Sequence, residues 1–150
     1  MKKALLTLLI SMVPVVELRG AIPFGVAAGI SVGLSFMIAL IGNMIPVPFI
    51  ILFIRPVFKW FKEKSQWLAN IARWFEGKAN RNIDKVLKYE FWGLVLLVAI
   101  PLPGTGAWTG ALVSAMMDMQ LKRAVPAIFV GTMIAGIIIS LATMGIIAII

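Results

Sequence analysis

The chain has no cysteine and no histidine, and it contains few charged residues. These absences exclude disulfides, thiolate nucleophiles, the usual zinc sites and any serine–histidine relay. An intramembrane aspartyl protease would need two aspartates inside the bilayer, but Asp84 lies in a strongly basic segment, away from Asp118. The sequence therefore predicts a protein that is not an enzyme and that has no catalytic residue, no metal site and no cofactor.

Apolar residues dominate what is present. They make up 61% of the 150 residues, charged residues only 13%, and the mean hydropathy is +1.03. Soluble domains carry about 25% charged residues, so this composition predicts an all-α integral membrane protein with one membrane domain, residues 1–150. Lys2 and Lys3 precede a short apolar run as in a signal peptide. No small-residue cleavage site follows that run, so we expect it to belong to the mature fold.

Two segments, 35–54 and 124–150, are apolar without interruption and long enough to cross a bilayer, which takes about 20 residues. The first contains Asn43 and then Pro46. We therefore expect a kink or local unwinding near Asn43, whose buried amide would need a hydrogen-bond partner.

Two other apolar segments, 4–34 and 89–118, are each interrupted in the middle by helix-breaking residues. The interruptions are residues 14–23 and residues 101–106, and about 10 to 14 helix-compatible residues flank each, too few to span a bilayer singly. Each segment is predicted to form a re-entrant helical hairpin. Small residues then recur every four positions, a pattern typical of close helix packing, at Gly25, Gly29 and Gly33 and again at Gly106, Gly110 and Ser114.

The segment 55–88 is a basic amphipathic linker that carries more than half of the 14 Lys and Arg residues. The positive-inside rule places it in the cytoplasm. Trp60, Trp67 and Trp74 recur every seven residues, which predicts an amphipathic helix lying on the inner leaflet. We expect that helix to end near Gly77, before a second helix that begins near Ile83.

The order of hairpin, span, linker, hairpin and span suggests two repeats. If both hairpins are re-entrant, the repeats are inverted, and Lys122 and Arg123 lie in the cytoplasm of a multi-pass inner-membrane protein. Lys2 and Lys3 would then lie outside, against the rule. Four full spans would instead place Lys122 and Arg123 outside. Charge alone does not separate these topologies, and the broken hairpins favour the inverted repeat.

Glu17 and Arg19 lie in the middle of an apolar segment. A charged side chain there costs about 2.5 to 3.5 kcal/mol on insertion scales, so both residues are candidates for function. Arg19 suits a phosphate or carboxylate, and a buried Glu17 could exchange a proton. The structural alternative is an ion pair that only fixes the hairpin tip, because residues two apart share a face in extended chain.

The other candidate site residues lie at the same interruptions or in the kink of the first span. Pro23 and the turn before residue 107 are predicted to begin the second half-helices, whose N-termini would favour an anion at the midplane. The alternative is that these residues only turn the chain. The set comprises Gly20, Pro23, Asn43, Pro101, Pro103, Gly104, Thr105 and Gly106.

Asp118 is interpreted as part of a solvated turn, paired with Lys122 four residues later. Trp92 and Trp108 are interpreted as packing or interface residues, with a role for Trp108 in lining a substrate site as the alternative.

The two interruptions resemble known signature segments. Residues 16–23 (VELRGAIP) and 101–108 (PLPGTGAW) resemble those of the small multidrug export protein family, and the resemblance runs over essentially the whole chain. That family is similar, more distantly, to the DedA/VTT superfamily, whose members are associated with lipid scrambling or polyprenyl-phosphate recycling. The resemblance implies an inverted-repeat fold with paired re-entrant hairpins. The DedA acidic and arginine motifs match only at Glu17 and Arg19.

Together these observations predict a proton-linked transporter or lipid translocator for an amphiphilic anion, with a lipid-linked phosphate as the favoured substrate. The anion would bind between the hairpin tips, held by Arg19 and the half-helix amides, while Glu17 carries the proton. One alternative is proton-coupled export of cationic drugs through Glu17, and another is a membrane assembly factor without transport. The expected partners are membrane lipids, the substrate and protons. Homo-oligomerisation stays open, and no nucleic-acid partner is expected.

Overall fold

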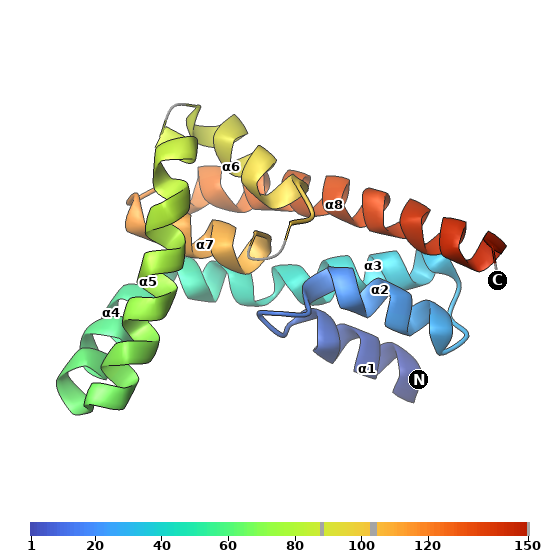
Figure 1. Cartoon of the computed structure of the whole chain (residues 1–150), viewed down its shortest axis with the longest axis horizontal. Helices are drawn as coiled ribbons and strands as arrows, with labels where there is room; N and C mark the ends of the chain where they lie inside the picture. The colour runs from blue at the N-terminus through green and yellow to red at the C-terminus, as the bar shows by residue number, and fades with distance from the viewer. Residues whose placement is uncertain (88, 103–104, 150) are drawn as a thin grey trace.

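The computed structural model describes residues 1–87, 89–102 and 105–149, without the side chains of 82, 84–87 and 147–149. Figure 1 shows that this part of the chain is built from helices and contains no strand. The all-helical prediction is therefore confirmed. The helices are α1 (Lys2–Ser11), α2 (Glu17–Ala27), α3 (Val32–Met44), α4 (Pro46–Lys64), α5 (Gln66–Leu87), α6 (Glu90–Ala99), α7 (Ala107–Met116) and α8 (Leu121–Ile149).

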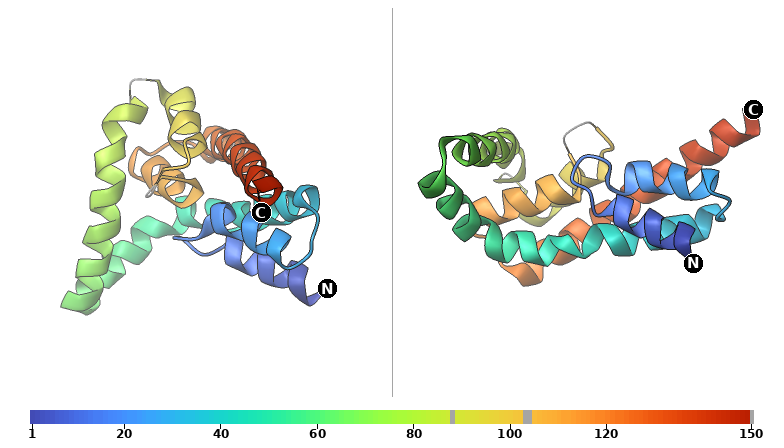
Figure 2. Two further views of the ribbon diagram at one scale, coloured as in Figure 1. Left: turned by 45° about the vertical axis from the view of Figure 1, so that its right-hand side comes forward. Right: turned by 90° about the horizontal axis from the view of Figure 1, so that it is seen from below.

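The helices form two packed groups and an arm. α1, α2 and α3 pack on one another, α6 and α7 pack with α8, and the two groups meet along α8. The C-terminal half of α4 and the N-terminal half of α5 form a V-shaped arm beyond these groups. Both chain termini lie at the opposite end of the molecule (Figures 1 and 2).

Two helical stretches, Val32–Lys64 and Leu121–Ile146, are long and apolar enough to cross a bilayer. The first is longer than the expected span 35–54 because α4 continues to Lys64. The expected unwinding near Asn43 is confined to a bend at Ile45, which keeps helical dihedral angles of −56° and −51°. Pro46 is the first residue of α4, a position where a helix needs no backbone N–H donor, so the proline does not disrupt α4.

The linker differs from its prediction. The prediction of a helix end near Gly77 is wrong, because α5 runs unbroken from Gln66 to Leu87. The break lies instead at Ser65, whose backbone is extended, so the tryptophan repeat is divided between α4 and α5. The two arms of the V are joined by the Lys62–Glu76 ion pair at 2.8 Å and by the rings of Phe58 and Phe75, 6.3 Å apart.

Polarity is distributed as expected for a protein in lipid. Large apolar side chains such as Leu5, Ile41, Phe53 and Leu141 are about half exposed on the outer helix faces. Exposing so many large apolar side chains to water would be unfavourable. Polar side chains are instead buried between the helices, among them Glu17 and Asn43. Together with the two long apolar stretches, this distribution identifies a membrane protein.

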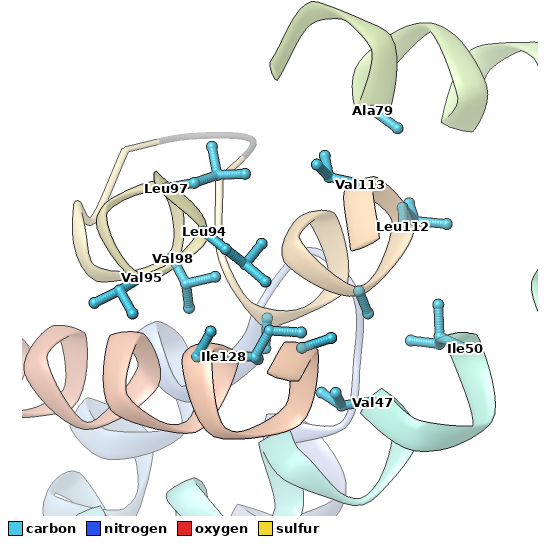
Figure 3. Close-up of a cluster of buried hydrophobic side chains, with 14 of the residues drawn as sticks. Val47, Ile50, Ala79, Leu94, Val95, Leu97, Val98, Leu112, Val113 and Ile128 are labelled. Carbon is cyan, nitrogen blue, oxygen red and sulfur yellow. The ribbon is translucent and has the colours of Figure 1, made fainter. Parts of the chain in front are cut away.

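The largest apolar core surrounds α7. Leu94 and Val98 of α6, Leu112 of α7, Ile128 of α8 and Val47 of α4 belong to one buried cluster (Figure 3). Gly110 allows this packing, because a Cβ there would lie 2.6 Å from the Val98 side chain. The core therefore fixes α7, whose N-terminus faces the break in the first hairpin.

Asp118 does not pair with Lys122, so the interpretation as a local i,i+4 pair is wrong. Its carboxylate accepts a hydrogen bond from Arg55 of α4, which also donates to the Met116 carbonyl at 2.9 Å. Arg123 pairs with Glu90 at 3.7 Å. The Arg55 contacts connect the end of α7 and the following loop to α4, whereas the Arg123–Glu90 pair connects the start of α8 to the start of α6.

Candidate functional site at the crossing of two helix breaks

The first break comprises residues 12–16, between α1 and α2. It is shorter than expected, because α2 begins at Glu17 and includes Gly20 and Pro23. The expectations that Pro23 begins the half-helix and that Glu17 and Arg19 lie in extended chain are therefore wrong. Glu17 has a left-handed φ of +50°, which is unusual for a residue with a side chain, and its side chain is buried.

The second break connects Ile100 to Gly106, and α7 begins at Ala107 as the sequence predicted. Gly106 has a φ of +128°, a conformation that side chains disfavour. Two of the predicted site residues, Pro103 and Gly104, lie outside the described residues.

Glu17 reaches across to the N-terminus of α7. Its Oε1 accepts a hydrogen bond from the Trp108 backbone N–H at 3.2 Å. The Trp108 side chain also contacts the first break, because its Nε1–H donates to the Met12 carbonyl at 3.1 Å. A carboxylate at this end of a helix is favourable, since the N-terminus has a partial positive charge and unsatisfied donors.

Arg19 reaches the opposite helix end, the C-terminus of α6. Its guanidinium donates to the Leu102 carbonyl at 2.6 Å, the Ile100 carbonyl at 3.3 Å and the Thr105 hydroxyl at 3.0 Å. The Thr105 hydroxyl in turn donates to the Ile100 carbonyl at 2.7 Å. A cation is favourable here, because the last carbonyls of a helix have a partial negative charge.

The two charges of the first hairpin therefore complement the two helix ends of the second. Glu17 and Arg19 form no direct ion pair within the part of the chain that the structure describes. The reason is that residues two apart on a helix point in different directions. The second hairpin has no charged residue at its break, and the two charges that contact it, Glu17 and Arg19, belong to the first hairpin.

The structure brings together Glu17, Arg19, Thr105 and Gly106, and Pro101 lies beside them at the end of α6. The other described candidates are Gly20, Pro23 and Asn43, which do not line the cavity that opens beside Arg19. Gly20 faces the side chain of Val16, and Pro23 is exposed on α2. Asn43 is fully buried in α3.

A cavity of about 260 Å³ opens beside Arg19. Lys78 of α5, Thr105 and Thr109 also line it, and none of the lining residues among the described side chains is acidic. A second cavity of about 100 Å³ shares Pro14, Val15, Lys78 and Thr109 with the first and is lined in addition by Trp74, Phe75, Trp108 and Leu112. The cavity therefore has a cationic part and an adjoining aromatic part.

Sequence reasoning missed Lys78. It lies in the basic linker, where every lysine resembles a solvated surface charge. Its ammonium lies 5.1 Å from the centre of the Trp74 ring. Only the packing of α5 over the hairpin breaks places it near Arg19, so no local signal could have distinguished it from its neighbours.

These features define a class: a small α-helical membrane protein with a buried glutamate and a partly buried arginine where two broken helix pairs cross. The family described as putative small multi-drug export proteins matches residues 17–138, a range that begins directly after the first break and includes the second. The chain belongs to this family, as its signature segments predicted. The family description is that of an export protein, so the chain is assigned to the membrane transporters. No curated protein and no solved structure matched the chain.

Proposed function

We propose that this protein is a proton-linked transporter of an amphiphilic anion, with the cavity beside Arg19 as the binding site. The observation that carries the proposal is the lining of that cavity. Arg19 and Lys78 supply positive charge, Thr105 and Thr109 supply hydroxyls, and the described part of the chain contributes no acidic residue to the lining. Guanidinium, ammonium and hydroxyl groups together suit a phosphate headgroup.

The aromatic part of the cavity supports an amphiphilic substrate. Trp74, Trp108 and Leu112 adjoin the cationic part, so a headgroup could contact Arg19 while its chain packs against the rings. A lipid-linked phosphate has this combination of groups and is our favoured substrate. The anion site differs from the sequence prediction, because Glu17 itself lies at the start of α7 and accepts a hydrogen bond from the Trp108 amide there.

Glu17 is the proposed proton carrier. As a carboxylate it accepts a hydrogen bond from the Trp108 amide in the first turn of α7 and so connects the two breaks. A hydrogen bond to a charged group contributes about 1.5 to 3 kcal/mol, roughly twice the contribution of a neutral one. Protonation of Glu17 would weaken this contact and free α7 to move relative to α2, which links proton uptake to opening of the crossing.

Export of cationic drugs through Glu17 is the second candidate, and the family description supports it. In that mechanism the Glu17 carboxylate would exchange a proton for a cationic drug. Two observations weigh against it: the nearby cavity is lined by two cations, and Glu17 is directed at the helix terminus. In an assembly factor without transport, Glu17 and Arg19 would serve only as structural contacts between the two breaks.

We further propose that each short helix pair is re-entrant and that the two halves are inverted repeats. α1, α2, α6 and α7 have 10 or 11 residues each, which is about half the length needed to cross the hydrocarbon core. The order of short helix, short helix and long helix occurs in both halves. The basic segment 55–88 is then cytoplasmic.

The topology predicts where single cysteines can be labelled. The chain has no native cysteine, so Lys64→Cys and Lys122→Cys each introduce a unique thiol. Both are expected to react with a membrane-impermeant maleimide only when it is supplied from the cytoplasmic side, because both positions follow the positive charge. Labelling of Lys122→Cys from outside would contradict the inverted repeat and support four full spans.

The proposed site also predicts how ligand affinity depends on pH. Probes whose charge is constant are needed, such as an alkyl sulfonate and an alkyltrimethylammonium of equal chain length. The sulfonate should bind more tightly as pH falls, because protonation of Glu17 removes a negative charge beside the cationic cavity. Tighter binding of the ammonium at high pH, lost in Glu17→Gln, would instead establish drug export.

Lys78→Gln tests the headgroup site in the same assay. It should weaken sulfonate binding at least fivefold and leave ammonium binding unweakened. Lys64→Gln is the matched control, because Lys64 is exposed at the end of α4 and lines neither cavity described above. Equal effects of both variants would show only a general attraction of anions to a basic protein.

A further inference from the structure

A second group of buried polar side chains lies away from the Arg19 cavity, between α1 and α3. Thr7, Ser11, Ser35 and Asn43 are each 0% exposed. Thr7 and Ser11 are one helical turn apart on α1, and Ser35 and Asn43 are on α3. We refer to these four residues as the polar seam.

Two glycines allow the residues of the polar seam to pack closely. At Gly25 of α2 an added Cβ would lie 2.6 Å from the Ser35 hydroxyl and 3.2 Å from the Thr7 methyl group, so these three residues meet. At Gly42 of α3 it would lie 2.0 Å from the Ser11 hydroxyl. The seam therefore runs from Thr7 and Ser35 to Ser11 and then to Asn43, which follows Gly42.

The register of α2 and α3 places Asn43 level with Glu17. The two helices are consecutive, pack against each other and run in opposite directions (Figure 1). Gly25 of α2 meets Ser35 of α3. Glu17 lies eight residues before Gly25 and Asn43 lies eight residues after Ser35, so the two residues are at the same level of the helix pair.

Several polar atoms along this path lack protein partners. Within the described part of the chain, the Ser35 hydroxyl, both polar atoms of the Asn43 amide and Glu17 Oε2 are buried and have no hydrogen-bond partner. An unsatisfied buried group costs about 1 to 3 kcal/mol. Close packing of small residues would explain the two glycines and the serines, but it does not explain a buried amide with neither end satisfied.

Water is the ligand that satisfies such groups, because one molecule can both donate to Glu17 or Asn43 and accept from Ser35. We propose that the polar seam is a hydrated route by which water and protons reach Glu17. Its outer end is at Lys3, whose carbonyl accepts from Thr7 and whose ammonium donates to the Ala28 carbonyl at 2.6 Å. This inference rests on the proposed function only in taking Glu17 as the proton carrier.

The route approaches Glu17 from the face opposite to that of the substrate. Arg19 and the cavity lie on the side of α5 and the second break, whereas the seam lies between α1, α2 and α3. Separate paths for proton and substrate allow Glu17 to exchange its proton without opening the cavity to water. The Glu17 side chain, bound to α7, stands between the two.

Substituted cysteines test the route in a chain that has no other thiol. Ser11→Cys and Ser35→Cys lie in the seam, and Ser114→Cys is the matched control, because Ser114 is also 0% exposed and bonds its own helix at Gly110. In protein reconstituted into vesicles, silver ions, which are small and enter through water, should react with both seam thiols at least tenfold faster than with the control. Equal rates at the three positions would overturn the proposal.

A second pair of variants tests the direction of entry. Thr7→Val should slow the silver reaction of Ser11→Cys at least threefold, because it removes the hydroxyl at the outer part of the seam. Thr132→Val is the control, since Thr132 is equally buried and likewise bonds the carbonyl four residues before it. No slowing by Thr7→Val, or equal slowing by both, would contradict entry past Thr7. The thiol reaction requires no transport, so its result is independent of the proposed function.

Discussion

Glu17→Gln should reduce transport at least tenfold while the protein remains folded in detergent. Glutamine has the same size and can still accept the Trp108 N–H, but it has no charge and cannot exchange a proton. If Glu17 served only to fix the hairpin tip, this neutral replacement would keep most of the activity. Flux in proteoliposomes, together with size-exclusion profiles, separates the two outcomes.

Glu76→Gln is the matched control for this prediction. Glu76 lies on α5 and pairs with Lys62 at the arm, away from the crossing. A partly exposed ion pair of this kind contributes about 0 to 1 kcal/mol, so transport and stability should change little. Comparable losses in both variants would assign the effect of Glu17→Gln to general disturbance of the fold.

Gly106→Ala should cause the largest loss of stability of any single methyl addition at the site. At a φ of +128° a side chain is strained, at a cost of about 1 to 3 kcal/mol. The added Cβ would also lie 2.0 Å from Glu17 Oε2, so the carboxylate must leave the start of α7. The combined cost is about 3 kcal/mol or more, which should lower the thermal unfolding midpoint by several degrees.

Gly33→Ala provides the opposite expectation from the same substitution. Gly33 lies in α3, and an added Cβ would have no atom within 4 Å. Alanine in a helix is favoured over glycine by about 0.5 to 1 kcal/mol, so the unfolding midpoint should stay constant or rise. If Gly106→Ala were tolerated as well as Gly33→Ala, the contact between Glu17 and α7 would not contribute to stability.

Local sequence signals predicted the helix break at residues 101–106 well, because glycine and proline act on the backbone at their own positions. The same signals misplaced the break in the first hairpin. Pro23 was expected to begin a helix, yet a proline can occur inside a helix when its neighbours satisfy the freed carbonyl, as is common in membrane proteins. The break at Ser65 had no proline or glycine to indicate it.

The sequence by itself determined that this is a helical membrane protein of the small multidrug export family, with Glu17 and Arg19 as its unusual charges. These conclusions depend on composition and on the cost of charge in lipid, which one residue and its neighbours reveal. Only the tertiary structure decided which partners the two charges have. Glu17 caps α7 and Arg19 holds the end of α6, while Lys78 arrives from α5. Those contacts join residues about 60 to 90 positions apart, and no periodicity or local propensity specifies such distant pairs.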